Sequence, residues 1–530
     1  MLAKHASPSL LFAALLILAL SVTPLASAQE GNTPVVWPTD GWTTSTPEAQ
    51  GMDSAAVAAY LLALSEPSLT VDSVMLVRHG QVVAEAYYAP STADTRFSVY
   101  SATKSVTSAL VGIALEQGFI KSIDEPVLSF FPDRTVSNLD AQKQAMTLRD
   151  LLTMGSGFAC NVNAGQDPEK DVWAADDWLQ ATLELPMAGA PGEQWRYCNL
   201  NFALVAAILE AATGQSAMEF AQANLFGPLG ITEVVWATRP DGGNGGAAGL
   251  QFSLRDWAKF GYLYLHGGQW DGAQIVPAQW VADSLTNQLS TPFGVGYGYG
   301  WWVFEGLGVL ALGGGGQYIF VLPGLDVLLV ATGTATEATR TMHQLPALLG
   351  GLMSMPYAGE PLPENPEGEA QLAAAIAAVA NPAPAAVPPL PEMAGQIDGK
   401  VYGLFSPALV SLEPVVDSVI PGMDTSVLGT QALSLSFSGD AAVLTLFFTD
   451  GQQEAIPVGL DGIYRVSTGR LGPIGAKGEW LTPNTFRVYL KNIGGSLQYR
   501  LDMTFNGAVL EIIAFEVHRG DVKAVFGATG

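Results

Sequence analysis

The sequence Ser101-Ala-Thr-Lys104 places a hydroxyl and an amine three residues apart. On a helix, residues at this spacing share a face, so both side chains can point into one site. A serine hydroxyl is a weak nucleophile and needs a base to take its proton. A lysine can be that base if burial or a nearby positive charge lowers its pKa. The pair would support attack on an acyl carbon, although a solvated lysine on a serine-capped helix has the same spacing.

Tyr197 and Asn199 form a second group with suitable chemistry. A phenol or phenolate at this place could pass a proton between Ser101, Lys104 and a leaving group. The Asn199 amide could hydrogen-bond to Lys104 and to a carbonyl of a bound molecule. The alternative is a loop tyrosine in front of a helix whose N-cap is Asn199.

A run of four glycines, Gly313 to Gly316, stands directly before the strand-like segment 318–322. Glycines at such a place let the backbone come close to a ligand. A backbone N–H of Gly313 or Gly314 could join the N–H of Ser101 in stabilising an oxyanion. A tight hairpin turn would use the same glycines, and the sequence leaves the choice between Gly313 and Gly314 open.

Other reaction chemistries lack their motifs. The sequence contains no Gly-x-Ser-x-Gly nucleophile elbow and no Gly-x-x-x-x-Gly-Lys phosphate loop. The 5 histidines are scattered without the spacing of metal ligands. We therefore expect neither a metal nor a cofactor.

The elements that would position these residues mix strands and helices. Residues 73–88 have the pattern of a hairpin with a glycine-containing turn at 78–81. Residues 318–330 have strand-like composition. A second strand-like segment, residues 297–303, precedes the glycine run. Helical patterns that end near glycines or turn clusters predict helices at 102–117, 148–154, 200–212 and 254–265. Strands at both ends with helices between them predict an α+β domain whose sheet joins the two ends.

The composition changes twice toward the C-terminus. Residues 357–393 are rich in proline and alanine, which is typical of a linker, with a short helix expected at 369–380. Residues 394–530 alternate apolar and polar side chains between turn signals. We expect a separate, mostly antiparallel β domain there, with no chemical motif of its own.

Charge and the N-terminus bear on location and partners. The chain has 49 acidic and 23 basic residues and a net charge of −26, which excludes nucleic acid and anionic lipid as expected partners. Residues 1–28 combine a basic start, an apolar run of about 11 residues and a small-residue site at Ala26-Ser27-Ala28. This pattern predicts a signal peptide, a secreted or periplasmic protein, and no stable membrane anchor after cleavage.

The two cysteines, Cys160 and Cys198, could pair in an oxidising compartment, or remain as two buried thiols. Because Cys198 stands between Tyr197 and Asn199, its side chain should point away from both. A disulfide would then tie the loop near Cys160 to this segment.

Four further motifs occur in order along the chain: Leu151-Leu-Thr-Met-Gly-Ser-Gly157, Pro228-Leu-Gly-Ile231, Asp256-Trp-Ala-Lys-Phe-Gly261 and Tyr297-Gly-Tyr-Gly-Trp-Trp302. With the segments above, they make residues 45–350 resemble the serine β-lactamase-related hydrolases. This group includes class C β-lactamases, D-alanyl-D-alanine carboxypeptidases, family VIII esterases and 6-aminohexanoate-dimer hydrolases. The resemblance implies a β-lactamase/transpeptidase-like domain over residues 29–356, with an antiparallel sheet, helices on both sides and a helical subdomain.

By this resemblance Ser101 matches the nucleophile, Lys104 the lysine of the first motif, and Tyr197 and Asn199 the second motif. The third motif departs from the family. Relatives carry Lys or His, then Thr or Ser, then Gly, whereas this chain has Ala311-Leu312-Gly313 or a neighbouring register. In penicillin-recognising members the cation and the hydroxyl are associated with the substrate carboxylate.

We therefore expect a small ester, amide or peptide-like substrate, cleaved as a linear ester or amide. Two alternatives remain open at this point. One is a β-lactamase or D-Ala-D-Ala carboxypeptidase, and the other is a non-catalytic binding protein on the same scaffold. The sequence does not indicate an oligomeric state.

Overall fold

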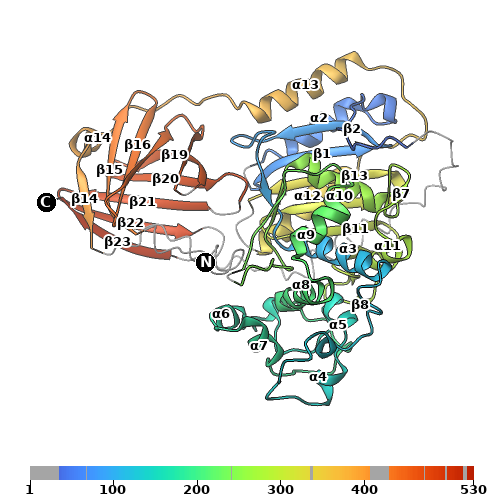
Figure 1. Cartoon of the computed structure of the whole chain (residues 1–530). Coiled ribbons are helices and arrows are strands. Elements are labelled where there is room, and N and C mark those ends of the chain that lie inside the picture. Colours follow the sequence, from blue (N-terminus) through green and yellow to red (C-terminus); the bar gives the residue numbers. More distant parts are fainter. Residues whose placement is uncertain are drawn as a thin grey trace.

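The computed structural model describes residues 35–66, 68–239, 241–334, 338–405, 429–470, 472–495, 498–516 and 522–529 (Figure 1). The predicted signal peptide, residues 1–28, lies outside the described residues. No helix in the described ranges is long and apolar enough to cross a membrane.

An eight-stranded antiparallel sheet is the centre of the first half of the molecule, in the order β2-β1-β13-β12-β11-β10-β9-β8. Its strands are β1 (Val71–Arg78), β2 (Gln81–Tyr87), β8 (Leu289–Ser290), β9 (Gly296–Tyr297), β10 (Trp302–Phe304), β11 (Gly308–Gly313), β12 (Gln317–Leu322) and β13 (Val327–Gly333). The pairing of β1 with β13 brings the two ends of this region together, as predicted. Every residue of β1, β12 and β13 is buried, because neighbouring elements cover these strands.

The helices of this region are α2 (Ser54–Ala63), α3 (Thr103–Glu116), α4 (Ala141–Ala145), α5 (Leu148–Leu152), α6 (Glu169–Trp173), α7 (Trp178–Leu183), α8 (Asn199–Thr213), α9 (Ala217–Ala221), α10 (Leu254–Leu265), α11 (Ala278–Ser284) and α12 (Ala338–Met353). Most of them lie close to the sheet, whereas α4, α5, α6 and α7 lie apart from it at the bottom of Figure 1. α10 lies close to the sheet at Gly261, where a Cβ atom would be 2.6 Å from Ile319 and from Leu328. We call this region the α+β domain, and its fold is the β-lactamase/transpeptidase-like one that was predicted.

Two strand predictions are wrong in detail. The segment 297–303 is interrupted between β9 and β10, where Gly300 has a positive φ of 78°. The segment 318–330 is divided by a 3-10 turn at Pro323–Leu325, followed by Asp326 in the left-handed region. Composition identified the strand-forming residues, but it did not show these backbone reversals.

The helix expected at 369–380 is part of α13 (Pro366–Ala380). Its Leu372, Ala375 and Val379 belong to the hydrophobic core of the α+β domain. Val379 also accepts a hydrogen bond from the Ala89 amide at 3.0 Å. This part of the proline-rich segment is therefore packed against the domain that precedes it. The short α14 (Glu392–Ile397) leads into the C-terminal strands.

The C-terminal region is a closed, mostly antiparallel barrel, which confirms the predicted β domain. Its strands are β14 (Val401–Leu404), β15 (Thr430–Ser438), β16 (Ala441–Phe448), β17 (Gln453–Gly459), β18 (Arg465–Gly469), β19 (Gly472–Thr482), β20 (Thr485–Asn492), β21 (Gln498–Asn506), β22 (Val509–Glu516) and β23 (Val522–Ala528). A parallel pairing of β17 with β19 closes it. Burial alternates along β16, as expected for strands with one face inside and one outside.

Candidate active site

The segment that carries Ser101 leaves a short strand and enters a helix. β3 (Phe97–Ser98) pairs with β5 (Leu250–Phe252), which in turn pairs with β4 (Val235–Trp236). Tyr100 follows with a φ of 45°, unusual for a residue with a side chain, and residues Tyr100–Ala102 form a 3-10 turn. This turn explains why α3 begins at Thr103, one residue later than predicted. It places Ser101 at the start of the helix, where free backbone N–H groups favour negative charge.

Lys104 lies on the first turn of α3 and is 1% exposed. Its Nζ atom donates to Ser101 Oγ at 3.0 Å, to Asn199 Oδ1 at 2.7 Å and to the Ala247 carbonyl at 2.9 Å. All three acceptors are uncharged, so they compensate only in part for the loss of water. Burial therefore lowers the pKa of Lys104 to about 7, and the Glu169 carboxyl opposes this shift. Near neutral pH, a substantial fraction of Lys104 is a free amine that can accept a proton.

The Tyr197 phenol hydrogen-bonds to Ser101, and its ring centroid is 5.0 Å from Lys104 Nζ. Burial raises the pKa of Tyr197 well above its usual value of 10. The phenol thus stays protonated at neutral pH and can donate a proton, while Lys104 is the better base. The Trp302 ring stacks on the Tyr197 ring with centroids 6.4 Å apart and planes 22° apart, which restricts its position.

Cys160 and Cys198 form a disulfide with a Cα–Cα distance of 5.4 Å, which confirms the predicted pairing. The amide of Val162 also donates to the Tyr197 carbonyl at 2.9 Å. These two links tie the loop after Cys160 to the start of α8. Cys198 is the N-cap residue of α8 and makes no side-chain capping bond. Asn199 is therefore the first helical residue rather than the N-cap, and its amide oxygen accepts from Lys104.

Glu169, on the first turn of α6, is an acidic residue of this site that the sequence did not reveal. Burial raises the pKa of its carboxyl to about 7, with a further contribution from Asp167, while Asn199 and Lys104 oppose the rise. Its buried Oε1 atom has no hydrogen-bond partner among the described residues. A single glutamate in a polar loop matches no sequence motif. Only the predicted disulfide of Cys160 indicated that this loop lies near the site.

The glycine run forms the turn of the β11–β12 hairpin, in which Gly313 pairs with Gln317. A Cβ atom on Gly313 would lie 2.1 Å from the carbonyl oxygen of Val99, two residues before Ser101. Gly313 thus packs against the segment that carries Ser101, whereas a Cβ on Gly314 would meet no atom within 4 Å. The glycine run forms a hairpin turn and also lies next to Ser101. The two interpretations of the sequence, a tight turn and a backbone that can approach a ligand, are therefore compatible.

The model of the Beta-lactamase family matches residues 55–348, more than half of the chain. The chain belongs to the β-lactamase family of serine hydrolases. It is 26% identical over 298 residues to the 6-aminohexanoate-dimer hydrolase of Paenarthrobacter ureafaciens, covering 52% of this chain and 75% of that one. It is 28% identical over 171 residues to the D-aminopeptidase of Brucella anthropi, covering 30% of this chain and 31% of that one.

The chain covers less than two thirds of the length of this D-aminopeptidase and of further relatives that it matches. Among solved structures, the octameric penicillin-binding protein homologue from Pyrococcus abyssi aligns with 89% of this chain and 99% of its own. Its sequence identity is 17% and the TM-score is 0.43.

The third family motif has no cation at its expected place on β11. None of the residues of β11 carries a charge or a hydroxyl, whether Ala311-Leu312-Gly313 or a neighbouring register takes the place of this motif. The side chains at this strand end are therefore apolar and offer no charge to a substrate carboxylate.

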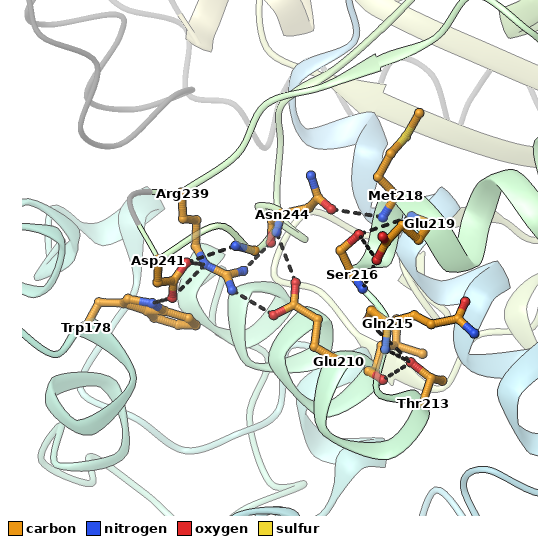
Figure 2. A network of polar contacts seen from close by, with 12 residues as sticks. Trp178, Glu210, Thr213, Gln215, Ser216, Met218, Glu219, Arg239, Asp241 and Asn244 are labelled. Carbon is orange, nitrogen blue, oxygen red and sulfur yellow. Dashed lines mark hydrogen bonds and ion pairs between the residues drawn. The ribbon is translucent and has the colours of Figure 1, made fainter.

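The far end of α8 is held by a polar network around Arg239 (Figure 2). Arg239 pairs with Glu210 of α8 at 2.8 Å and with Asp241 at 3.0 Å, and its guanidinium lies 4.6 Å from the Trp178 ring. The Glu210 carboxylate also accepts from the Asn244 amide at 3.0 Å. This network fixes the loop that continues to Ala247, whose carbonyl binds Lys104.

Proposed function

We propose that this β-lactamase-family hydrolase cleaves an ester or a linear amide through an acyl-enzyme on Ser101. The proposal depends mainly on one observation: Lys104 Nζ lies 3.0 Å from Ser101 Oγ in an environment that favours the free amine. A nucleophile within hydrogen-bond reach of its base is the first requirement for covalent catalysis.

In the proposed reaction, Lys104 takes the proton of Ser101 as Oγ bonds to the carbonyl carbon. The tetrahedral oxyanion would accept hydrogen bonds from the N–H of Ser101 and from Gly313 or Gly314. Tyr197 gives its proton to the leaving alcohol or amine as the old bond breaks, and regains one from the Lys104 ammonium. Water then attacks the acyl-enzyme, with Lys104 again as base, and releases the acid and the free serine.

The apolar end of β11 favours substrates without a carboxylate next to the scissile bond. A carboxylate placed beside this end of β11 would lose water without gaining a charged side chain of the strand as a partner. This argues for linear esters and neutral amides over penicillins and D-Ala-D-Ala peptides. The relative named as a 6-aminohexanoate-dimer hydrolase supports amide cleavage as well as ester cleavage.

We further propose that the protein acts outside the cytoplasm, secreted or periplasmic. Disulfides persist mainly in oxidising compartments, and Cys160–Cys198 is one. The predicted signal peptide at residues 1–28 points the same way.

The test is a comparison of Ser101→Ala with Ser108→Ala. Ser108 lies on the same helix, and its buried hydroxyl has no partner among the described residues, so its removal should leave the site unchanged. Wild type and Ser108→Ala should react with a fluorophosphonate probe and hydrolyse p-nitrophenyl esters, while Ser101→Ala should do neither. Labelling that persists in Ser101→Ala would point to another nucleophile.

Intact-mass measurement after incubation with esters, linear amides, nitrocefin and D-Ala-D-Ala peptides would decide the substrate class. We expect an acyl adduct from the first two. Efficient acylation by nitrocefin or by the peptides would favour the β-lactamase or carboxypeptidase alternative. A wild type that is never acylated would favour the binding-protein alternative.

A further inference from the structure

The barrel touches the α+β domain directly in front of the nucleophile. Gly494, which follows β20, accepts a hydrogen bond through its carbonyl from the Ser98 amide at 2.7 Å. A Cβ atom on Gly494 would lie 1.9 Å from the Arg96 carbonyl oxygen. The two backbones are thus so close that only glycine fits at this position. β20 and β21 run toward the α+β domain in Figure 1.

A buried ion pair holds the same end of the barrel in place. Lys491 of β20 pairs with Asp72 of β1, and the two side chains are 8% and 2% exposed. Asp72 also accepts hydrogen bonds from Thr334 Oγ1 at 3.1 and 3.2 Å. A buried pair of this kind contributes more to specific geometry than to net stability, because both charges lose their water. It therefore fixes how β20 is placed on β1.

The strand that receives Gly494 leads to Ser101. β3 is an edge strand of its three-stranded sheet, with β5 on one side. The Gly494 carbonyl pairs with an amide that this edge strand would otherwise leave without a strand partner. Two residues, Val99 and Tyr100, lie between Ser98 and Ser101, and the Val99 amide donates to the Leu250 carbonyl at 3.0 Å. The entry to the nucleophile turn is thus held by the α+β domain and by the barrel together.

We propose that the barrel is a positioning part of the active site: Gly494 and the Lys491–Asp72 pair fix β3 and, through it, Ser101. Gly494 is a positioning residue that acts through Ser98. The predicted effect of Gly494 on the reaction rate rests on the proposed function of Ser101. Its predicted effect on the order of residues 96–103 does not.

The experiment compares Gly494→Ala with Gly507→Ala in the full chain. Both glycines follow barrel strands and have positive φ, 83° and 66°, so alanine has a similar backbone cost at each. A Cβ on Gly507 meets no atom within 4 Å, whereas one on Gly494 would collide with Arg96. The comparison therefore isolates the contact with the α+β domain.

Two quantities are measured well below the unfolding temperature: the rate of fluorophosphonate acylation of Ser101, and hydrogen exchange in peptides covering residues 96–103. Gly494→Ala should lower the acylation rate about tenfold, since small displacements of a reacting group have effects of this size. For a turned-over ester, kcat should fall while KM changes little. Exchange in the 96–103 segment should rise. Gly507→Ala should match wild type in all of these measurements.

Equal acylation rates and equal exchange in both variants would overturn the inference. The inference would also be overturned if the acylation rates of both variants fell in proportion to their loss of thermal stability. If wild type is not labelled at Ser101, the proposed function fails, and the exchange comparison alone decides whether the barrel orders this segment. If Gly494→Ala does not fold, the double variant Asp72→Asn, Lys491→Met replaces it, with the same changes expected and the same overturning results.

Discussion

The α+β domain and the barrel bury their side chains in different ways. β1, β12 and β13 of the α+β domain are buried along their whole length, whereas burial alternates along β16 and β21 of the barrel. A sheet enclosed by other elements has no outer face, while a barrel strand has one face inside and one in water.

The two regions also differ in the partners of the ionisable groups that they bury. The core of the barrel is a cluster of apolar and aromatic side chains. Ionisable groups are buried in both regions, among them Lys491 and Asp461 of the barrel and Lys104, Lys143 and Arg239 of the α+β domain. Of these, Arg239 has carboxylate partners, whereas the three hydrogen-bond acceptors of Lys104 are all uncharged. Lys143 likewise donates to an amide oxygen, that of Asn138. The comparison teaches that a buried amine becomes a candidate for chemistry when a hydroxyl such as that of Ser101 lies within hydrogen-bond distance of it.

Lys104→Met would break this comparison most severely. Without a base next to Ser101, acylation by an ester or a fluorophosphonate should fall by about 10³-fold or more, because both proton transfer and activation of the nucleophile are lost. Lys143→Met is the matched control. Lys143 of α4 is also a buried lysine, but its Nζ atom donates a hydrogen bond to Asn138 rather than to a serine hydroxyl. Equal rate losses in the two variants would refute the special role of Lys104.

The disulfide distinguishes the two regions as well, because both cysteines lie in the α+β domain. Replacing both by alanine should lower the free energy of unfolding of this domain by about 2–4 kcal/mol, from the closed loop of 38 residues. Tryptophan fluorescence during urea unfolding measures this free energy. The signal reports mainly on the α+β domain, because Trp480 is the one tryptophan of the 12 that lies in the barrel. Hydrogen exchange of β21 should stay unchanged, and a similar loss of protection there would contradict the local role.

The pH dependence of acylation gives the smallest and most specific effect. Lys104 is a base only when neutral, and its pKa is lowered to about 7, so the rate should rise as the pH increases through about 7 and then level off. The Glu169 carboxylate favours the ammonium form of Lys104. Glu169→Gln should therefore move the rise to lower pH. Because the pKa of Glu169 is itself raised to about 7, the rate should exceed that of wild type most clearly near pH 7, by about twofold to threefold.

Asp171→Asn, an exposed change on the same short helix as Glu169, is the control and should leave the pH profile unchanged. A profile that moves to higher pH in Glu169→Gln would show that the carboxylate does not act on Lys104 as the structure indicates.

The parts of the site that could be predicted are those in which one short segment carries the geometry. Ser101 and Lys104 are three residues apart, so their spacing allowed the prediction that both side chains can point into one site. The helix at Leu254–Leu265 was predicted to the residue, because a serine N-cap and regular apolar spacing mark its start and course.

The other parts depend on contacts between distant segments. The Ala247 carbonyl, a partner of Lys104, is a backbone atom 143 residues away, and backbone atoms have no sequence signature. Glu169 reaches the site only because its loop folds back onto the start of α8. The contact of Gly494 with Ser98 joins two domains that were predicted to be separate. Burial of a specific lysine, and hence its lowered pKa, also follows only from the completed fold.

The sulfur atoms of Cys160 and Cys198 belong to residues with no exposed surface. A reductant in solution cannot reach this bond unless the chain first opens locally, since exchange requires direct attack on a sulfur atom. The bond state of a purified sample is therefore a record of the compartment in which the chain folded, and recombinant protein made in a reducing cytoplasm would differ covalently from protein made in an oxidising one.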